Sequence, residues 1–151
     1  MTKKITPFLW FDDNAYEAAK FYVKTFKGGK ITKVRKQGGK VFWVTFRIEG
    51  QDFMALNGGP HYQLTPAISL FVDCKDQKEV DALWKRFTKD GAESRCGWLV
   101  DKFGLSWQIV PRRLMQLLID PDPKRARGAT QAMMKMNKID IAALEAGARA
   151  G

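Results

Sequence analysis

The chain has 151 residues, and its content of 45% hydrophobic and 12% aromatic residues is enough for the core of one domain. It contains no apolar run of the ~18–20 residues that a membrane-spanning helix requires, so we expect no membrane partner. Two cysteines are too few for a disulfide framework, and no signal-peptide segment is evident, so we expect a cytoplasmic location.

The formal net charge of +10 is unevenly distributed, since seven Lys and Arg residues and no acid lie between Lys24 and Lys40. A basic surface can attract nucleic acid, anionic membranes or small anions. No helix-turn-helix, zinc-finger or aromatic RNA-binding motif accompanies these cations. We therefore interpret them as a solvated face and do not favour nucleic acid as a partner, although an interaction protein that binds it stays a third alternative.

The first part of the chain predicts one helix and four strands. The helix begins at Asn14, with Glu17 three residues later in capping-box spacing, and ends at Gly28-Gly29. Gly38-Gly39 predicts a hairpin turn. Strands are predicted at residues 4–11, 30–36, 41–48 and 52–56.

The same order of elements then starts again, offset by 62 residues. Asp76 and Glu79 repeat the capping pair, Trp84 takes the place of Tyr22, and Gly91 ends the helix. The second set of strands is predicted at residues 67–73, 92–95, 98–100 and 105–110. A tandem βαβββ plan of class α+β follows, with residues 1–58 as the first module and residues 67–111 as the second.

After Pro111 the pattern becomes helical. Helices are predicted at residues 112–119, 126–136 and 141–148, the last capped by Asp140. Residues 112–151 therefore form a helical extension of what we expect to be a single domain over residues 1–151.

Several segments resemble the vicinal oxygen chelate superfamily, which includes glyoxalases and bleomycin-resistance proteins. The likeness is strongest to its PhnB-like branch, called the "3-demethylubiquinone-9 3-methyltransferase" domain. It rests on these stretches: Phe8-Leu-Trp-Phe-Asp12, Phe53-Met-Ala-Leu-Asn-Gly-Gly-Pro-His61, Cys96-Gly-Trp98 and Asp101-Lys-Phe-Gly-Leu-Ser-Trp-Gln-Ile-Val-Pro111. The resemblance implies that eight strands from two modules curl into an open cup that holds the site, and that the protein is a homodimer.

Metalloenzymes of this superfamily bind a divalent ion through His, Glu or Gln on the first and last strands of each module. The resemblance places these positions at Pro7, Ala55, Ala67 and Gln108, of which only Gln108 has a donor atom. One neutral amide is not a metal site, so we expect no metal and no cofactor.

Strand alternation predicts which side chains line the cup. With the loop residue His61 and the aromatic wall Trp98, the predicted pocket consists of Leu9, Phe53, Asn57, His61, Ser69, Phe71, Trp98, Ser106 and Gln108. Such a lining, apolar with a few polar groups, is typical of a small-molecule pocket. The alternative is that the cup's own aromatic side chains fill it.

Two side chains are candidates for catalysis. His61 is the only histidine and can exchange a proton near neutral pH, but no acid close in sequence orients it. Cys96 follows Arg95, whose side chain should point the other way on a strand, so an inert thiol is the simpler interpretation.

Two main hypotheses follow. The first is a metal-independent protein that binds a small hydrophobic or aromatic molecule as a homodimer. The second is an enzyme that uses His61, Gln108 and Cys96, either as a methyltransferase or as a glyoxalase-like isomerase or lyase. Neither strand-to-helix turn carries the glycines with which doubly wound methyltransferases bind their cofactor, which weakens the methyltransferase variant.

Overall fold

The computed structural model describes residues 3–151, and the chain divides into two compact units, Met1–Leu64 and Thr65–Gly151. The first unit contains β1 (Phe8–Phe11), α1 (Ala15–Thr25), β2 (Lys30–Gln37), β3 (Lys40–Ile48) and β4 (Gln51–Asn57). The second unit contains β5 (Leu70–Cys74), α2 (Gln77–Thr88), β6 (Ala92–Glu93), β7 (Trp98–Val100), β8 (Ser106–Pro111), α3 (Arg112–Leu118), α4 (Pro123–Met133) and α5 (Ile141–Ala150).

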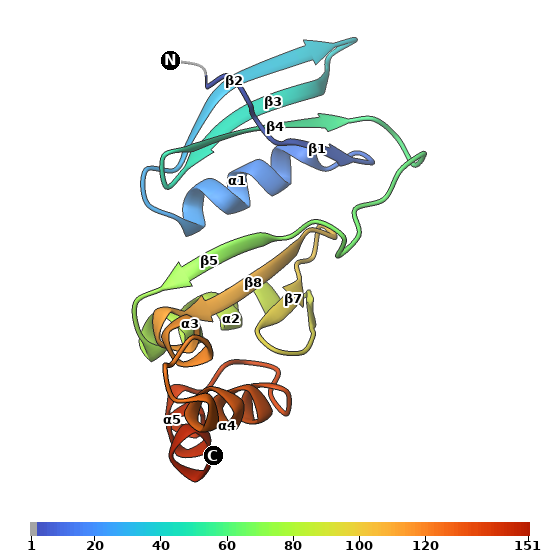
Figure 1. Ribbon diagram of the computed structural model, residues 1–151. Helices are drawn as coiled ribbons and strands as arrows, with labels where there is room; N and C mark the ends of the chain where they lie inside the picture. The colour runs from blue at the N-terminus through green and yellow to red at the C-terminus, as the bar shows by residue number, and fades with distance from the viewer. Residues whose placement is uncertain (1–2) are drawn as a thin grey trace. The chain divides into compact units, whose positions relative to one another are not determined.

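The strands form two hydrogen-bonded sheets with the same topology (Figure 1). The orders are β1-β4-β3-β2 and β5-β8-β7-β6, and in each sheet the first and last strands of the module pair in parallel. The tandem βαβββ plan and the α+β class are confirmed. That the two sheets join into one cup of eight strands stays a prediction.

The core of the first unit lies between its sheet and α1, which covers one face of the strands (Figure 1). Tyr22 of α1 contacts Phe46 of β3, with ring centroids 6.0 Å apart, and Phe46 stacks on Phe53 of β4 at 5.2 Å. Leu9 and Ala55 pair in register on the same side of the sheet. Burial of these large apolar side chains therefore holds α1 on this face.

The two predicted capping pairs behave differently. Asp76 caps α2 as predicted, because its carboxylate accepts a hydrogen bond from the backbone N–H of Glu79 at 2.9 Å. The side chain of Asn14 makes no such bond at the start of α1, so that half of the prediction is wrong. Asn57, at the end of β4, accepts from the N–H of Ala15 at 2.8 Å instead and donates to the carbonyl of Val41 at 3.1 Å.

In the second unit, the turn between β7 and β8 is organised by a buried carboxylate. Asp101 accepts hydrogen bonds from the N–H groups of Phe103 and Leu105 and from the indole Nε1 of Trp107, at 2.8, 3.0 and 2.9 Å. The Trp107 ring stacks on Phe87 of α2, with centroids 4.6 Å apart. One carboxylate therefore fixes the turn, the start of β8 and the indole that anchors α2.

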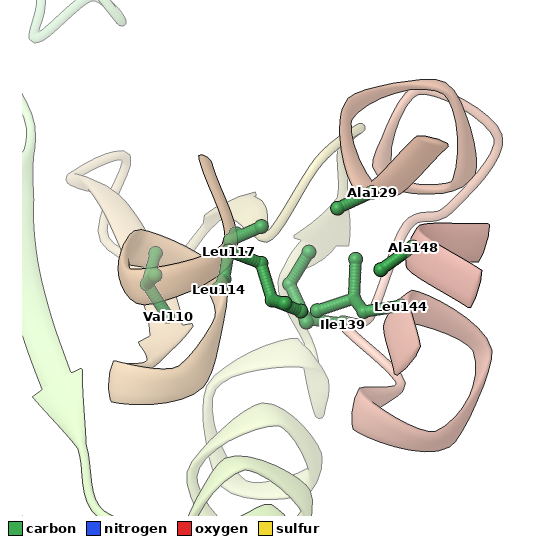
Figure 2. Packing of buried hydrophobic residues seen from close by; sticks show 7 residues of the cluster. All are labelled: Val110, Leu114, Leu117, Ala129, Ile139, Leu144 and Ala148. Atoms are coloured by element: carbon green, nitrogen blue, oxygen red, sulfur yellow. The ribbon is translucent and has the colours of Figure 1, made fainter. Parts of the chain in front are cut away.

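The three C-terminal helices close around an apolar cluster (Figure 2). Side chains from the end of β8, the three helices and the α4–α5 turn meet in it: Val110, Leu114, Leu117, Ala129, Ile139, Leu144 and Ala148. Gln77 of α2 fastens this cluster to the rest of the unit, because its amide donates to the carbonyl of Ile139 at 2.9 Å and accepts from the N–H of Ile141 at 2.8 Å. Across residues 3–151, no helix combines the length and the apolar character needed to cross a bilayer.

Candidate functional site

Three of the predicted pocket residues form one row across the second sheet. Phe71 of β5 pairs with Gln108 of β8, and Gln108 pairs with Trp98 of β7, so their side chains share one face. Trp107, the neighbour of Gln108, points to the opposite face, where it contacts α2. Phe71 is 48% exposed, and Trp98 and Gln108 are partly exposed. The row therefore lies on the face opposite α2.

Two serines supply polar groups beside this row. The Gln108 amide Nε2 donates to the Ser69 Oγ at 3.0 Å. Ser106, two residues before Gln108 on the same side of β8, is only 1% exposed, and its Oγ has no hydrogen-bond partner within residues 3–151. A buried hydroxyl without a partner is costly, so it marks a place where a ligand or a water molecule would be stabilised. We call this surface the Gln108 face: Ser69, Phe71, Trp98, Ser106 and Gln108.

In the first module, the predicted pocket residues Leu9 and Phe53 lie on the face of the sheet that the helix covers. Leu9 and Phe53 are 4% and 5% exposed, on the side of the first sheet that packs against α1. Ala55, the position that the resemblance assigns to a metal ligand, is fully buried on that side. In the first module these side chains therefore lie on the α1 side of the sheet and not on its open face, because shifting the alternation by one residue exchanges the two faces of a strand. That they line a ligand cup stays a prediction.

Asn57 has a structural task and also borders a hollow of the first unit. Its amide ties the start of α1 to β3, as described above. The hollow measures about 510 Å³, and its lining includes three acidic residues, Asp12, Asp13 and Glu17, and one lysine, Lys40. Of the predicted pocket residues, Asn57 is the one that borders it.

His61 lies exposed in the connection between β4 and β5. Within the described chain, no acid or other polar group bonds its imidazole. A general base needs an orienting partner or a held substrate, so this geometry alone does not define a catalytic centre.

The two cysteines differ in environment. Cys74 is buried at the end of β5, and desolvation, together with Glu79 and Asp73 nearby, raises the pKa of its thiol to about 12. It is therefore protonated and inert near neutral pH. Cys96 is partly exposed in the turn before β7, with its Sγ 3.9 Å from the Sδ of Met134, and a thioether cannot activate a thiol.

The donor set does not fit the divalent ion that metalloenzymes of this fold hold. Within residues 3–151, no group of three or more His, Cys, Asp or Glu side chains has an arrangement that could hold a metal ion. The Gln108 amide is the one donor at the four positions carried over from those enzymes. A single neutral amide oxygen is too weak to hold such an ion.

The side of the first sheet that faces away from α1 carries an aromatic surface, which strand alternation did not predict. Phe8 and Trp10 of β1, Trp43 of β3, and Met54 and Leu56 of β4 all lie on the face opposite α1. The indole of Trp10 is held in place by a 2.9 Å hydrogen bond to the carbonyl of Gly59. We call this aromatic surface the Trp43 face.

This arrangement is similar to that of known proteins. Residues 3–110 match the family described as 3-demethylubiquinone-9 3-methyltransferase. A PhnB protein from Bacillus cereus is 33% identical, with a TM-score of 0.68 over 72% of this chain and 99% of that one. Protein PA1353 from Pseudomonas aeruginosa is 17% identical, with a TM-score of 0.61 over 73% and 98%. A lactoylglutathione lyase from Agrobacterium tumefaciens is 17% identical, with a TM-score of 0.42 over 71% and 91%. No curated protein sequence matches.

Two βαβββ units of identical topology, together with the family model and the relative that is 33% identical, define an α+β protein of the PhnB-like class. Within that class, the chain belongs to the PhnB-like family described as 3-demethylubiquinone-9 3-methyltransferase. The match ends at residue 110, so helices α3, α4 and α5 lie beyond the matched residues.

Proposed function

We propose that the protein binds a small planar, largely apolar molecule on the Gln108 face, without a metal ion. The observation that carries this proposal is the row of Phe71, Gln108 and Trp98, in which two aromatic rings flank an amide. Aromatic rings provide stacking area, and an amide with a serine hydroxyl beside it orients a carbonyl or hydroxyl group of the ligand. The hydroxyl of Ser106 adds a second polar group that a ligand would satisfy.

The family's description names a methyltransferase that acts on 3-demethylubiquinone-9, which is a ring compound. A ring of that kind suits the same face, so an enzyme stays the second candidate. Neither strand-to-helix junction contains a glycine turn of the kind that binds a nucleotide-like methyl donor in doubly wound folds, which is why binding is the favoured proposal.

Thermal unfolding with a panel of aromatic compounds, including a ubiquinol analogue, tests the proposal. A ligand at about 100 times its Kd stabilises the folded state by about 2.7 kcal/mol, which raises the Tm of a chain of this size by several degrees. Phe71→Ala and Gln108→Ala should each weaken binding about tenfold, because each removes a central contact.

Matched controls are Phe42→Ala, another exposed strand aromatic, and Gln116→Ala, an exposed glutamine on α3. Both should leave the Tm shift unchanged. If no compound raises the Tm, or if the controls weaken binding as much as the test variants, the proposal is wrong. Product formation in the presence of a methyl donor, lost in Gln108→Ala, would favour the enzyme over the binding protein.

We also propose that the protein is a cytoplasmic homodimer that uses the C-terminal helices. Three apolar side chains of this region are exposed, Met115, Ile119 and Met134, and burying them against a second copy is favourable. The two free cysteines agree with a reducing compartment. Sedimentation equilibrium should give twice the chain mass, and Met115→Lys with Ile119→Lys should give the monomer. A wild-type monomer at high concentration would contradict the dimer.

A further inference from the structure

The Trp43 face has a cation at the edge of each of its two aromatic rows. In the first row, Arg35 of β2 pairs with Trp43 of β3, Trp43 pairs with Leu56 of β4, and Leu56 pairs with Trp10 of β1. Paired residues in neighbouring strands share a face, so Arg35 and Trp43 are direct neighbours on the Trp43 face.

The second row also has a cation at its β2 end, and it contains one aromatic ring. Lys33 of β2 pairs with Thr45, Thr45 pairs with Met54, and Met54 pairs with Phe8, which is 52% exposed. Neighbouring strands are about 5 Å apart, so the cation of each row stands at the edge of an apolar and aromatic surface.

The positive charge on this edge is not neutralised by the described part of the chain. β2 is an edge strand, and neither Lys33 nor Arg35 has an acidic partner within residues 3–151. The acid on this face, Asp52, is paired with Arg47 at 2.6 Å. Lys33 and Arg35 therefore add uncompensated positive charge to the β2 edge of the Trp43 face.

We propose that the Trp43 face binds single-stranded nucleic acid. Unpaired bases stack on the rings of Trp43 and Phe8, and the phosphates of the same strand lie along Lys33 and Arg35. An aromatic sheet face that stacks bases, beside a basic groove or edge that follows the backbone, is how many proteins bind single strands with little sequence preference. Stacking needs unpaired bases, so a duplex meets only the charged edge.

Fluorescence anisotropy of a labelled oligothymidylate with the full chain tests this proposal. Affinity should fall steeply with salt, and duplex DNA of the same length should bind more weakly. Lys33→Glu with Arg35→Glu should lower the slope of log Kd against log salt by about 1.4, which is about 0.7 for each lost phosphate contact. Trp43→Ala and Phe8→Ala should each weaken binding about tenfold, whereas Trp43→Phe should retain most of the affinity.

Lys78→Glu with Lys85→Glu is the matched control, because both lysines are exposed on α2 and the change in net charge is the same. It should leave the salt slope near the wild-type value. The proposal is overturned if this control weakens binding as much as the β2 variant, or if duplex binds as tightly as single strand. It is also overturned if folded Phe8→Ala keeps full affinity and Trp43→Ala either keeps it too or loses it only by unfolding. Circular dichroism of every variant identifies unfolding.

Compounds that bind the Gln108 face serve as a separate readout, since variants of the Trp43 face should leave that binding intact.

Discussion

Asp101→Ala is expected to lower the free energy of unfolding of the second unit by about 4 kcal/mol. The substitution leaves two backbone N–H groups, of Phe103 and Leu105, and the Nε1–H of Trp107 without their shared acceptor. Asp101 and Trp107 are both buried, so water cannot easily replace the carboxylate, and each unpaired donor costs about 1–3 kcal/mol. Urea unfolding followed by tryptophan fluorescence measures the change.

Asp101→Asn sharpens this prediction. The amide keeps one oxygen for the two backbone N–H groups but presents an NH₂ group to the indole of Trp107, which also donates. We expect a loss of about 2 kcal/mol, between wild type and Asp101→Ala. Asp13→Ala, an exposed aspartate in a loop, should change stability by no more than about 0.5 kcal/mol. A loss below about 1 kcal/mol in Asp101→Ala would contradict the role given to this carboxylate.

Gly128→Ala is expected to destabilise the C-terminal helices by about 3 kcal/mol. In an isolated helix this change raises stability by about 1 kcal/mol, since alanine is the better helix former. Here the new Cβ would lie 2.0 Å from the carbonyl oxygen of Gly147 on α5, so the two helices have to separate. The sign of the effect therefore reports the close contact between α4 and α5.

The reciprocal change, Gly147→Ala, places a Cβ 2.7 Å from the carbonyl oxygen of Gly128 and should act in the same direction with a smaller effect. Arg127→Ala, at an exposed neighbouring position of α4, serves as the control and should be nearly neutral. Thermal unfolding by circular dichroism measures all three. A higher Tm for either glycine variant is incompatible with the helix contact described here.

The order of elements was predictable because local signals repeat along the chain. Gly38-Gly39 has φ of +59° and +77°, which other residues rarely adopt, and this pair forms the predicted hairpin between β2 and β3. Asp76 caps α2 from its own position in sequence. Signals of this kind act over a few residues, so sequence alone is enough to find them.

Strand alternation could not predict which face of the first sheet packs against α1, because both sides of its strands are apolar. In β1, Leu9 and Phe11 point to α1, while Phe8 and Trp10 are equally hydrophobic and lie on the other side. Hydrophobicity therefore cannot say which set the helix covers. In the second module Gln108 is polar and its neighbours Trp107 and Ile109 are not, so the faces of β8 could be distinguished.

Contacts between distant residues account for the remaining differences. Asn57 takes the role that the local pattern gives to Asn14, although it lies 42 residues from Ala15 in sequence. The cations of the Trp43 face lie on β2 and its rings lie on β1 and β3, so no single stretch of sequence contains both. Only the strand register brings them together.

A ¹H–¹⁵N NMR titration of the full chain with the tightest compound from the aromatic panel tests whether the Gln108 face binds a planar ligand. We expect the largest shifts at saturation on the side-chain amide of Gln108, the indole N–H of Trp98 and the backbone N–H of Phe71. A saturated spectrum in which these three signals do not move would contradict it.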